Sequence, residues 1–205
     1  MSVRPKNPGF LDRWSFGGYN HNQMMNRINL SLFIPRADIE VYLERLAAEI
    51  NRSYQDKPLV IIGVLKGSFI FMADLIRRLN MPVELEFVGL ASYGQNTQSS
   101  GKVRLTRPLK RDITGKDVLV VEDIVDSGLT ISYLLKYLKR RKANSVKLCA
   151  LLSKPSRRIC PVEIDYLGCE VEDKFLVGYG LDRGECHRQL PEIFALEEQP
   201  DADKP

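Results

Sequence analysis

The strongest constraint on the fold of this chain is a regular alternation between short apolar runs and helical patterns. Several of the runs are rich in valine, isoleucine and leucine, which is typical of strands buried on both faces of a sheet. Strands that alternate with helices of about 10 to 15 residues form βαβ units and therefore a parallel sheet, whose ligand crevice lies beyond the carboxyl ends of the strands. The pattern predicts strands at 59–64, 83–90, 102–107, 118–122, 145–152, 164–169 and 175–177, and helices at 34–51, 69–79 and 131–141.

The length and composition predict a single domain. A chain of 205 residues suffices for one substantial core, and 44% hydrophobic with 27% charged residues excludes fibrous and wholly disordered classes. We expect the domain to span 31–198. Residues 1–30 show no period and are expected to be an irregular arm, and the polar segment 199–205 is expected to be a flexible tail.

No segment is expected to enter or cross a membrane. The apolar runs are too short to span a bilayer, and no apolar stretch follows Arg4 and Lys6 as it does in a secretory signal. The four cysteines form neither a CxxC pair nor a familiar metal spacing, so reduced and packed thiols are expected. These features together predict a cytoplasmic protein.

The charge is mildly basic. A net charge of +4 suits an anionic small-molecule substrate or weak nucleic-acid contact, and decides between neither. The densest basic run, 136–142, falls in the last turns of a predicted helix, where cations complement the helix dipole. This placement favours a solvated helix end over a nucleic-acid surface, so no nucleic-acid partner is expected.

The segment 122–130 carries the clearest chemistry. It reads Glu-Asp-Ile-Val-Asp-Ser-Gly-Leu-Thr, between a predicted strand and the start of a predicted helix. Backbone N–H groups and hydroxyls at a helix start bind phosphate, and the adjacent Glu122 and Asp123 can accept hydrogen bonds from ribose hydroxyls. A ribose-5-phosphate site is one interpretation. The other is a capping motif, with Asp126 or Ser127 as the N-cap and the carboxylates simply solvated.

The segment resembles the phosphoribosyl-diphosphate binding signature of type I phosphoribosyltransferases, in the hypoxanthine/guanine branch. Further landmarks follow in the family's order, and the resemblance covers 34–196: Leu-Lys-Gly-Ser at 65–68, Ser-Tyr at 92–93, a lysine at 154, and the segments 173–182 and 185–188. It implies a central parallel sheet flanked by helices, with a small hood from the N- and C-terminal segments. It also implies a homodimer or homotetramer.

The resemblance implies a role for each landmark. Asp126 would be catalytic, by taking or sharing the proton of the purine N7. Lys66, Gly67 and Arg188 would bind pyrophosphate, in a loop whose Leu65–Lys66 peptide bond is often cis in the family. Ser92 and Tyr93 would begin a lid over the reacting centre. The ribose and its 5-phosphate would be bound by Glu122, Asp123, Asp126, Ser127, Gly128, Leu129 and Thr130.

The purine and metal sites are implied in the same way. The purine would be bound by Lys154, which donates to the 6-oxygen, by Phe175, which stacks on the base, and by Leu176 and Asp182. Mg²⁺ would be held by Glu122, Asp123 and Asp182. Without the resemblance, a surface lysine at 66 or 154 and a core aromatic at 175 are the ordinary interpretations. The chain departs from the family at Arg183 and His187, where relatives carry aromatic residues, and we expect His187 to pack rather than to transfer protons.

The implied reaction joins a 6-oxopurine to phosphoribosyl diphosphate and releases pyrophosphate. A xanthine-preferring enzyme is not excluded, whereas Lys154 argues against adenine. A nucleic-acid-binding regulator that kept this fold, as in the pyrimidine attenuation proteins, would need a larger basic face. A flavodoxin-like binding domain would leave Lys66, Lys154 and Arg188 without a role.

Overall fold

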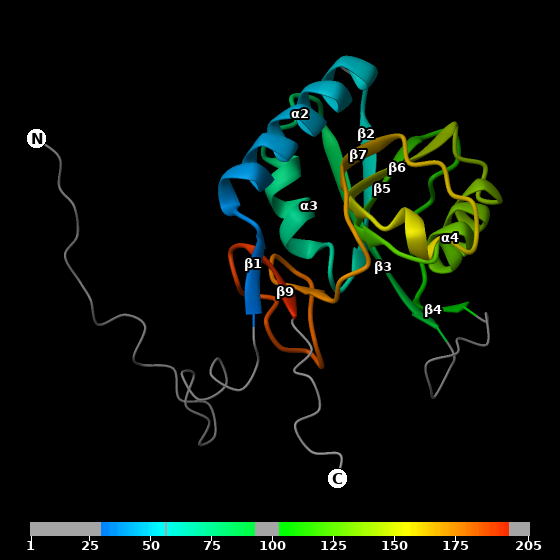
Figure 1. Ribbon diagram of the computed structural model, residues 1–205. Helices are drawn as coiled ribbons and strands as arrows, with labels where there is room; N and C mark the ends of the chain where they lie inside the picture. The colour runs from blue at the N-terminus through cyan, green and yellow to red at the C-terminus, as the bar shows by residue number, and fades with distance from the viewer. Residues whose placement is uncertain (1–29, 56, 93–102, 197–205) are drawn as a thin grey trace, which may run out of the picture.

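The fold is built on a six-stranded sheet, seen in a computed structural model that describes residues 30–55, 57–92 and 103–196 (Figure 1). Its strand order is β4-β3-β2-β5-β6-β7. Every neighbouring pair is parallel except β3 and β4, which are antiparallel. The strands are β2 (Leu59–Leu65), β3 (Val83–Ser92), β4 (Val103–Arg107), β5 (Asp117–Val125), β6 (Ser145–Ser153) and β7 (Tyr166–Glu170). The predicted parallel α/β sheet is therefore confirmed.

Helices cover both faces of the sheet, so each strand buries alternate side chains in two cores. Helices α2 (Arg36–Tyr54) and α3 (Phe69–Ile76) pack on one face, over Ile61, Leu119 and Leu151. Helix α4 (Leu129–Lys139) packs on the other face, over Val60, Val118 and Leu148. Figure 1 shows this division, with α2 and α3 to the left of the sheet and α4 to its right. The separation of odd and even positions follows from the two-residue period of a strand.

Strand β5 is longer than the sequence pattern predicts. The prediction ended this strand at Glu122, whereas the strand continues through Asp123 to Val125. The reason is pairing: Glu122 lies opposite Ala150 in β6, and the register continues to Ser153. Both carboxylates therefore belong to a central strand and are held more rigidly than loop residues.

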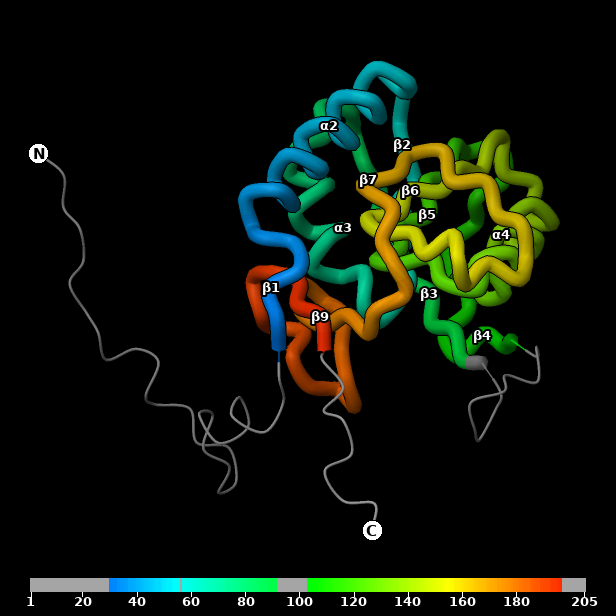
Figure 2. The backbone as a smooth tube through the Cα atoms, in the orientation of Figure 1, coloured from blue at the N-terminus to red at the C-terminus, as the bar shows by residue number. Residues whose placement is uncertain are grey.

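A second, smaller sheet forms a hood at one end of the molecule. Its order is β1-β9-β8, with β1 (Leu30–Ile34), β8 (Leu176–Val177) and β9 (Ile193–Leu196). All its pairs are antiparallel, and Leu30 lies opposite Leu196. Figure 2 shows the two ends of the described chain side by side, β1 in blue and β9 in red. A hood from the N- and C-terminal segments is therefore present, although β1 and β9 were not predicted as strands.

The predicted helices exist with shifted ends. Helix α2 begins at Arg36 rather than Ile34, because Ile34 ends β1 and Pro35 is the N-cap. Helix α3 ends at Ile76, three residues early, and α4 begins two residues early at Leu129. Across the residues that the structure describes, no helix is both long and apolar enough to cross a membrane.

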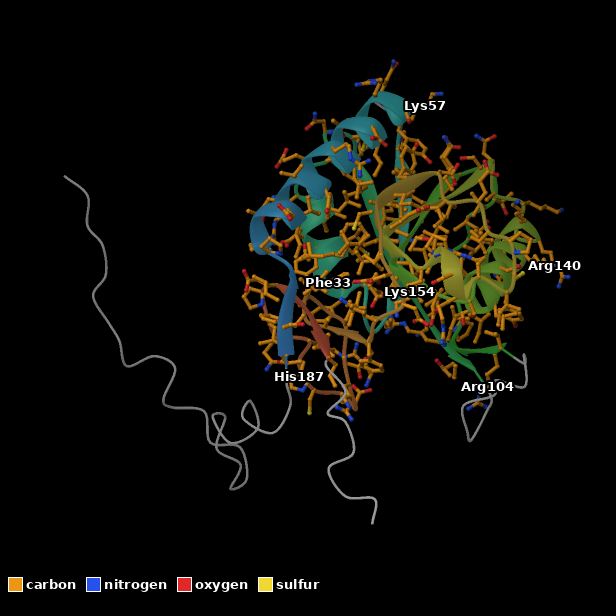
Figure 3. All side chains as sticks on the ribbon, in the orientation of Figure 1. Phe33, Lys57, Arg104, Arg140, Lys154 and His187 are labelled. Atoms are coloured by element: carbon orange, nitrogen blue, oxygen red, sulfur yellow. The ribbon has the colours of Figure 1, made fainter. Side chains whose placement is uncertain are left out.

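The basic run 136–142 lies away from the end of the sheet that carries the predicted site. Its lysines and arginines are exposed. Figure 3 shows Arg140 at the outer edge of the molecule, whereas Lys154 lies near its centre. This position agrees with a solvated helix end.

Candidate active site

The phosphate-binding candidate is the turn between β5 and α4. Gly128 is the N-cap of α4 and has a left-handed backbone with φ of 81°. The N-cap is Gly128 and neither Asp126 nor Ser127, so the predicted N-cap residue is wrong. Ser127 Oγ nevertheless accepts a hydrogen bond from the N–H of Leu129 at 3.4 Å. The turn encloses a cavity of about 120 Å³, whose lining includes Glu122, Asp126 and Thr130. The first N–H groups of a helix have no partner within it, which makes this cavity suitable for a phosphate.

The turn is supported from behind by the segment that follows Lys154. The backbone N–H groups of Ile159 and Cys160 both donate to the carbonyl of Ser127, at 3.0 Å. A β-carbon at Gly128 would overlap the carbonyl oxygen of Cys160, so a glycine is required both by its φ and by this close approach. The loop is therefore held in one shape by the chain behind it.

Glu122 and Asp123 are poorly solvated carboxyl groups. Glu122 is buried, and its Oε2 has no hydrogen-bond partner among the described residues. Burial and the neighbouring Asp123 raise the pKa of Glu122 well above its usual value. Burial raises the pKa of Asp123 to about 6, although the charge of Arg188 opposes this shift. A buried carboxyl oxygen without a partner, here Glu122 Oε2, indicates a site that is completed by a ligand.

The loop between β2 and α3 lies directly against Asp123. The Leu65–Lys66 peptide bond is cis, as the resemblance implied. Gly67 sits so close to Asp123 that a β-carbon there would lie 2.5 Å from Asp123 Cγ. Lys66 projects outward, and its ammonium is 2.8 Å from Glu185 Oε2. The structure thus brings Lys66 and Gly67 beside the acidic pair of β5.

Arg188 reaches the same place from the hood. Its Nη1 donates to the carbonyl of Gly180 at 2.8 Å, and its Nη2 lies 2.8 Å from Asp182 Oδ1. Its Nε is buried and has no partner in the described parts of the chain. Lys66, Glu185 and Arg188 line a cavity of about 500 Å³ with Leu65, Phe69, Phe87 and Arg107. Three cations around an open cavity indicate room for a polyanion.

The base-side residues lie at the ends of β6 and in the hood. Lys154 follows β6, and its buried ammonium donates to the carbonyl of Lys174 at 2.6 Å and lies 3.7 Å from Asp173 Oδ1. Phe175 is 55% exposed, which excludes the core-aromatic alternative. Leu176 is buried in β8. An exposed ring beside a buried ammonium provides a stacking surface and a directed donor.

Arg157 connects the two halves of the site, and the sequence reasoning gave it no catalytic or binding role. Its Nε is 3.4 Å from Asp126 Oδ1, and its Nη1 is 3.5 Å from Asp173 Oδ2. It lies on the short 3₁₀ turn Pro155–Arg157, directly after Lys154. Its position three residues after a site lysine was the available signal. Its partners lie directly after β5 and in the 173–175 segment, so the sequence around Arg157 does not indicate them.

The lid prediction falls largely outside the described residues. Ser92 is the last residue of β3 and pairs with Val103. Tyr93 lies outside the described residues. His187 is 7% exposed and has a left-handed backbone, which agrees with a packing role.

Comparison with known proteins assigns these features to one family. The phosphoribosyl transferase domain family matches residues 37–183. A hypoxanthine-guanine phosphoribosyltransferase from Bacillus subtilis is 44% identical over 173 residues, which cover 84% of this chain and 96% of that protein. One from Aquifex aeolicus is 45% identical over 170 residues, which cover 82% of this chain and 96% of that protein. The chain belongs to the hypoxanthine-guanine phosphoribosyltransferase family.

Solved structures of this family agree with the fold described above. A crystal structure of a hypoxanthine phosphoribosyltransferase from Staphylococcus aureus matches with a TM-score of 0.81 at 39% sequence identity. The match covers 86% of this chain and 96% of that chain. The six-stranded sheet, its helices and the hood are therefore a type I phosphoribosyltransferase fold.

A divalent cation suits this hypoxanthine-guanine phosphoribosyltransferase site only if a substrate supplies some of its ligands. Among the residues that the structure describes, no three His, Cys, Asp or Glu side chains form a cluster that could hold an ion. Glu122, Asp123 and Asp182 therefore do not form one protein cage. Mg²⁺ is usually held by one or two carboxylates together with substrate phosphates and water. The partnerless Glu122 Oε2 and the accessible Asp182 carboxylate fit that mode of binding.

Proposed function

We propose that this protein is a purine salvage enzyme that transfers the 5-phosphoribosyl group from phosphoribosyl diphosphate to hypoxanthine, guanine or both, and releases pyrophosphate. The position of Lys154 carries the proposal. Its backbone N–H donates to the carbonyl of Val125 at 3.0 Å, which places the buried lysine beside Asp126 at the end of the neighbouring strand. A donor for a 6-oxopurine and a base for its N7 proton then lie on adjacent strands. The names of the relatives support the same reaction.

We assign the ribose phosphate to the turn that follows β5. The N–H groups of Ser127 to Thr130, with the two hydroxyls, bind the 5-phosphate at the positive end of α4. Glu122 and Asp123 accept hydrogen bonds from the ribose hydroxyls once they are ionised. The rigid strand that carries both carboxylates supports this role.

We assign the pyrophosphate to the loop and hood residues Lys66, Gly67 and Arg188. Cleavage at the anomeric carbon moves negative charge onto the departing pyrophosphate, and cations fixed in advance stabilise that charge. Lys66 pairs with Glu185, and Arg188 pairs with Asp182. The substrate therefore replaces existing partners of these cations.

We assign the purine to Lys154, Phe175, Leu176 and Asp182, with Asp126 as the catalytic base. Lys154 donates to the 6-oxygen, Phe175 stacks on the ring, and Asp126 takes or shares the N7 proton as the new bond forms. The contact with Arg157, whose Nε lies 3.4 Å from Asp126 Oδ1, positions the carboxyl group. Ser92 and Tyr93 begin the segment that excludes water from the reacting centre.

We further assign Mg²⁺ to Asp182 and to the Glu122–Asp123 pair. When bound, Mg²⁺ supplies positive charge to the diphosphate oxygens. Asp182 suits this role because it is exposed enough to exchange Arg188 for another cation. The acidic pair suits it because ionisation of these buried groups is favoured by a nearby positive charge.

One assay tests the proposal. Purified protein is incubated with Mg²⁺, phosphoribosyl diphosphate and one of hypoxanthine, guanine, xanthine or adenine, and nucleotide formation is followed directly. The expected result is nucleotide from hypoxanthine or guanine, dependent on Mg²⁺. Activity with adenine alone would contradict the role of Lys154, and preference for xanthine would change the substrate but keep the reaction.

We also propose a single domain over 31–198, a homodimer or homotetramer, and a cytoplasmic location. All four cysteines lie in the described residues and are free thiols, which suits a reducing compartment. Light scattering on the purified protein measures the assembly, and cell fractionation with an antibody tests the location.

A further inference from the structure

A buried tyrosine in the hood donates a hydrogen bond to a buried aspartate in the core. Tyr179 is 1% exposed, and its hydroxyl donates to Asp74 Oδ2 at 2.7 Å. Asp74 lies on α3 and is itself 7% exposed. Arg36 Nη2 donates to the same oxygen at 3.1 Å, and its guanidinium lies 5.2 Å from the centre of the Tyr179 ring. Asp74 also pairs with Arg77.

The turn that contains Tyr179 has an unusual backbone. Tyr179 has φ of 50°, between Gly178 at 96° and Gly180 at 100°. Glycines adopt positive φ readily, but a tyrosine at φ of 50° is uncommon and persists only where its surroundings hold it. Both the backbone and the side chain of Tyr179 hold the turn in place. Its N–H donates to the carbonyl of Leu190 at 2.8 Å, and its hydroxyl donates to Asp74.

This turn contacts the proposed pyrophosphate site on two sides. A β-carbon at Gly180 would overlap the carbonyl oxygen of Gly67 and lie 3.2 Å from its carbonyl carbon. Gly180 donates its N–H to the carbonyl of Arg188 at 3.0 Å and accepts from Arg188 Nη1 at 2.8 Å. The position of Gly180 therefore affects both the Lys66–Gly67 loop and the Arg188 side chain.

The loop and α3 are also continuous. Helix α3 begins at Phe69, two residues after Gly67, and Ser68 Oγ donates to the carbonyl of Val64 at 2.7 Å. Helix α3 therefore positions the Lys66–Gly67 loop through the covalent backbone, and it positions the turn at Tyr179 through Asp74. A change at Asp74 or Tyr179 is expected to move Arg188 relative to Gly67.

We propose that Asp74 and Tyr179 are a positioning pair for the pyrophosphate half of the site. The hydrogen bond between their side chains holds Gly180 against Gly67. It thereby fixes the distance between Arg188 on the hood and the Lys66–Gly67 loop on the core. The inference rests on the proposed role of these cations in binding pyrophosphate. It adds two residues that touch no substrate.

The test is Tyr179→Phe, which removes the hydroxyl and keeps the ring. The Michaelis constants for phosphoribosyl diphosphate and, in the reverse reaction, for pyrophosphate are expected to rise roughly tenfold, the effect of losing one buried hydrogen bond. Those for hypoxanthine and its nucleotide are expected to change less than about twofold. Asp74→Asn alone and in combination with Tyr179→Phe is expected to give effects on pyrophosphate binding that do not add, because the two side chains share one hydrogen bond, while the loss of the ion pairs with Arg36 and Arg77 affects the melting temperature.

Tyr166→Phe is the matched control. Tyr166 is also buried, and its hydroxyl accepts from Lys147 at 3.3 Å in β6, outside the proposed site. This variant is expected to change the melting temperature without changing either Michaelis constant. If Asp74→Asn does not fold, the test depends on Tyr179→Phe, which keeps all charges.

Calorimetric binding of magnesium pyrophosphate provides a second measurement that needs no turnover. Weaker binding to Tyr179→Phe than to the unmodified protein supports the pair. Equal binding, or equal losses for both substrates, overturns it. Pyrophosphate binding without nucleotide formation from any purine would overturn the proposed function and leave the positioning pair intact.

Discussion

Gly67 lies directly beneath the carboxylate of Asp123, at a distance that leaves no room for a side chain. A β-carbon at Gly67 would meet Asp123 Cγ at 2.5 Å, and its Oδ2 at a still shorter distance. The two residues come from loops and strands far apart in the sequence, and this contact joins the proposed pyrophosphate loop to the proposed ribose carboxylates.

Replacement of Gly67 by alanine is therefore expected to damage substrate binding. The added methyl group displaces either the loop or Asp123, so the Michaelis constant for phosphoribosyl diphosphate is expected to rise at least about tenfold, equivalent to about 1.4 kcal/mol. Steady-state kinetics measures this. Gly115→Ala is the control for the kinetics: a β-carbon there meets nothing within 4 Å, and the φ of 68° costs stability without a contact to the site. Equal kinetics for both variants would show that Asp123 moves away without consequence.

Asp126 is expected to act on turnover rather than on binding. Asp126→Asn keeps the shape of the phosphate turn and removes the base, so kcat is expected to fall about 10²-fold or more while the Michaelis constant for phosphoribosyl diphosphate changes little. Asp173→Asn is the comparison variant, because it also removes a partner of Arg157; since Asp173 contacts Lys154 as well, its effect is expected on the Michaelis constant for the purine rather than on kcat. Unchanged turnover in Asp126→Asn would remove this residue from the mechanism.

The local sequence pattern was sufficient to predict the six-stranded sheet and its helices, but it did not predict the hood. The buried strands 59–64 and 145–152 were predicted within one residue at each end, because continuous apolar β-branched runs reflect burial on both faces. Strands β1 and β9 were missed, because they are only five and four residues long and β1 becomes a strand by pairing with β9 from the opposite end of the described chain. Such pairing is tertiary and has no local signal.

The same distinction applies to the site. Residues within one motif, such as those of 122–130, were identified because a strand, a glycine and hydroxyls follow one another in sequence. Arg157 and the Asp74–Tyr179 pair act through contacts between distant elements, so no local pattern indicated them. The glycines on both sides of Tyr179 were a signal for an unusual turn, but they did not identify its partner.

Asp123 is expected to make substrate binding dependent on pH. With a pKa of about 6, this carboxyl is largely protonated at pH 5 and ionised at pH 7.5. Only the ionised form accepts both ribose hydrogen bonds or contacts Mg²⁺, so the Michaelis constant for phosphoribosyl diphosphate is expected to fall as pH rises, and to level above about pH 7. Asp123→Asn is expected to bind weakly at every pH, without this slope. A slope retained in that variant would assign the titration to another group.

Glu122 is expected to make the folded protein less stable as pH rises, whereas Asp123 is expected to make substrate binding stronger. Its folded-state pKa is raised, so the folded protein holds this proton more tightly than the unfolded chain does. Its contribution to stability is fully present below the unfolded pKa and is lost as pH rises through the folded pKa, by at most about 1.4 kcal/mol per pH unit. Glu122→Gln is expected to gain in melting temperature relative to the unmodified protein as pH increases from 5 to 8. A constant difference across that range would contradict the assignment.

Lys154 is expected to decide between 6-oxopurines and adenine. Lys154→Met keeps much of the stem but removes the ammonium, so kcat/KM for hypoxanthine and guanine is expected to fall about 10- to 100-fold, the effect of losing a charged hydrogen-bond donor. Any adenine activity is expected to be unchanged, because its exocyclic amine does not accept from a lysine. Lys174→Met is the control, since its carbonyl still accepts from Lys154 and only its exposed side chain is lost. Equal losses in both variants would mean that the segment 173–175, rather than the ammonium, controls the choice of base.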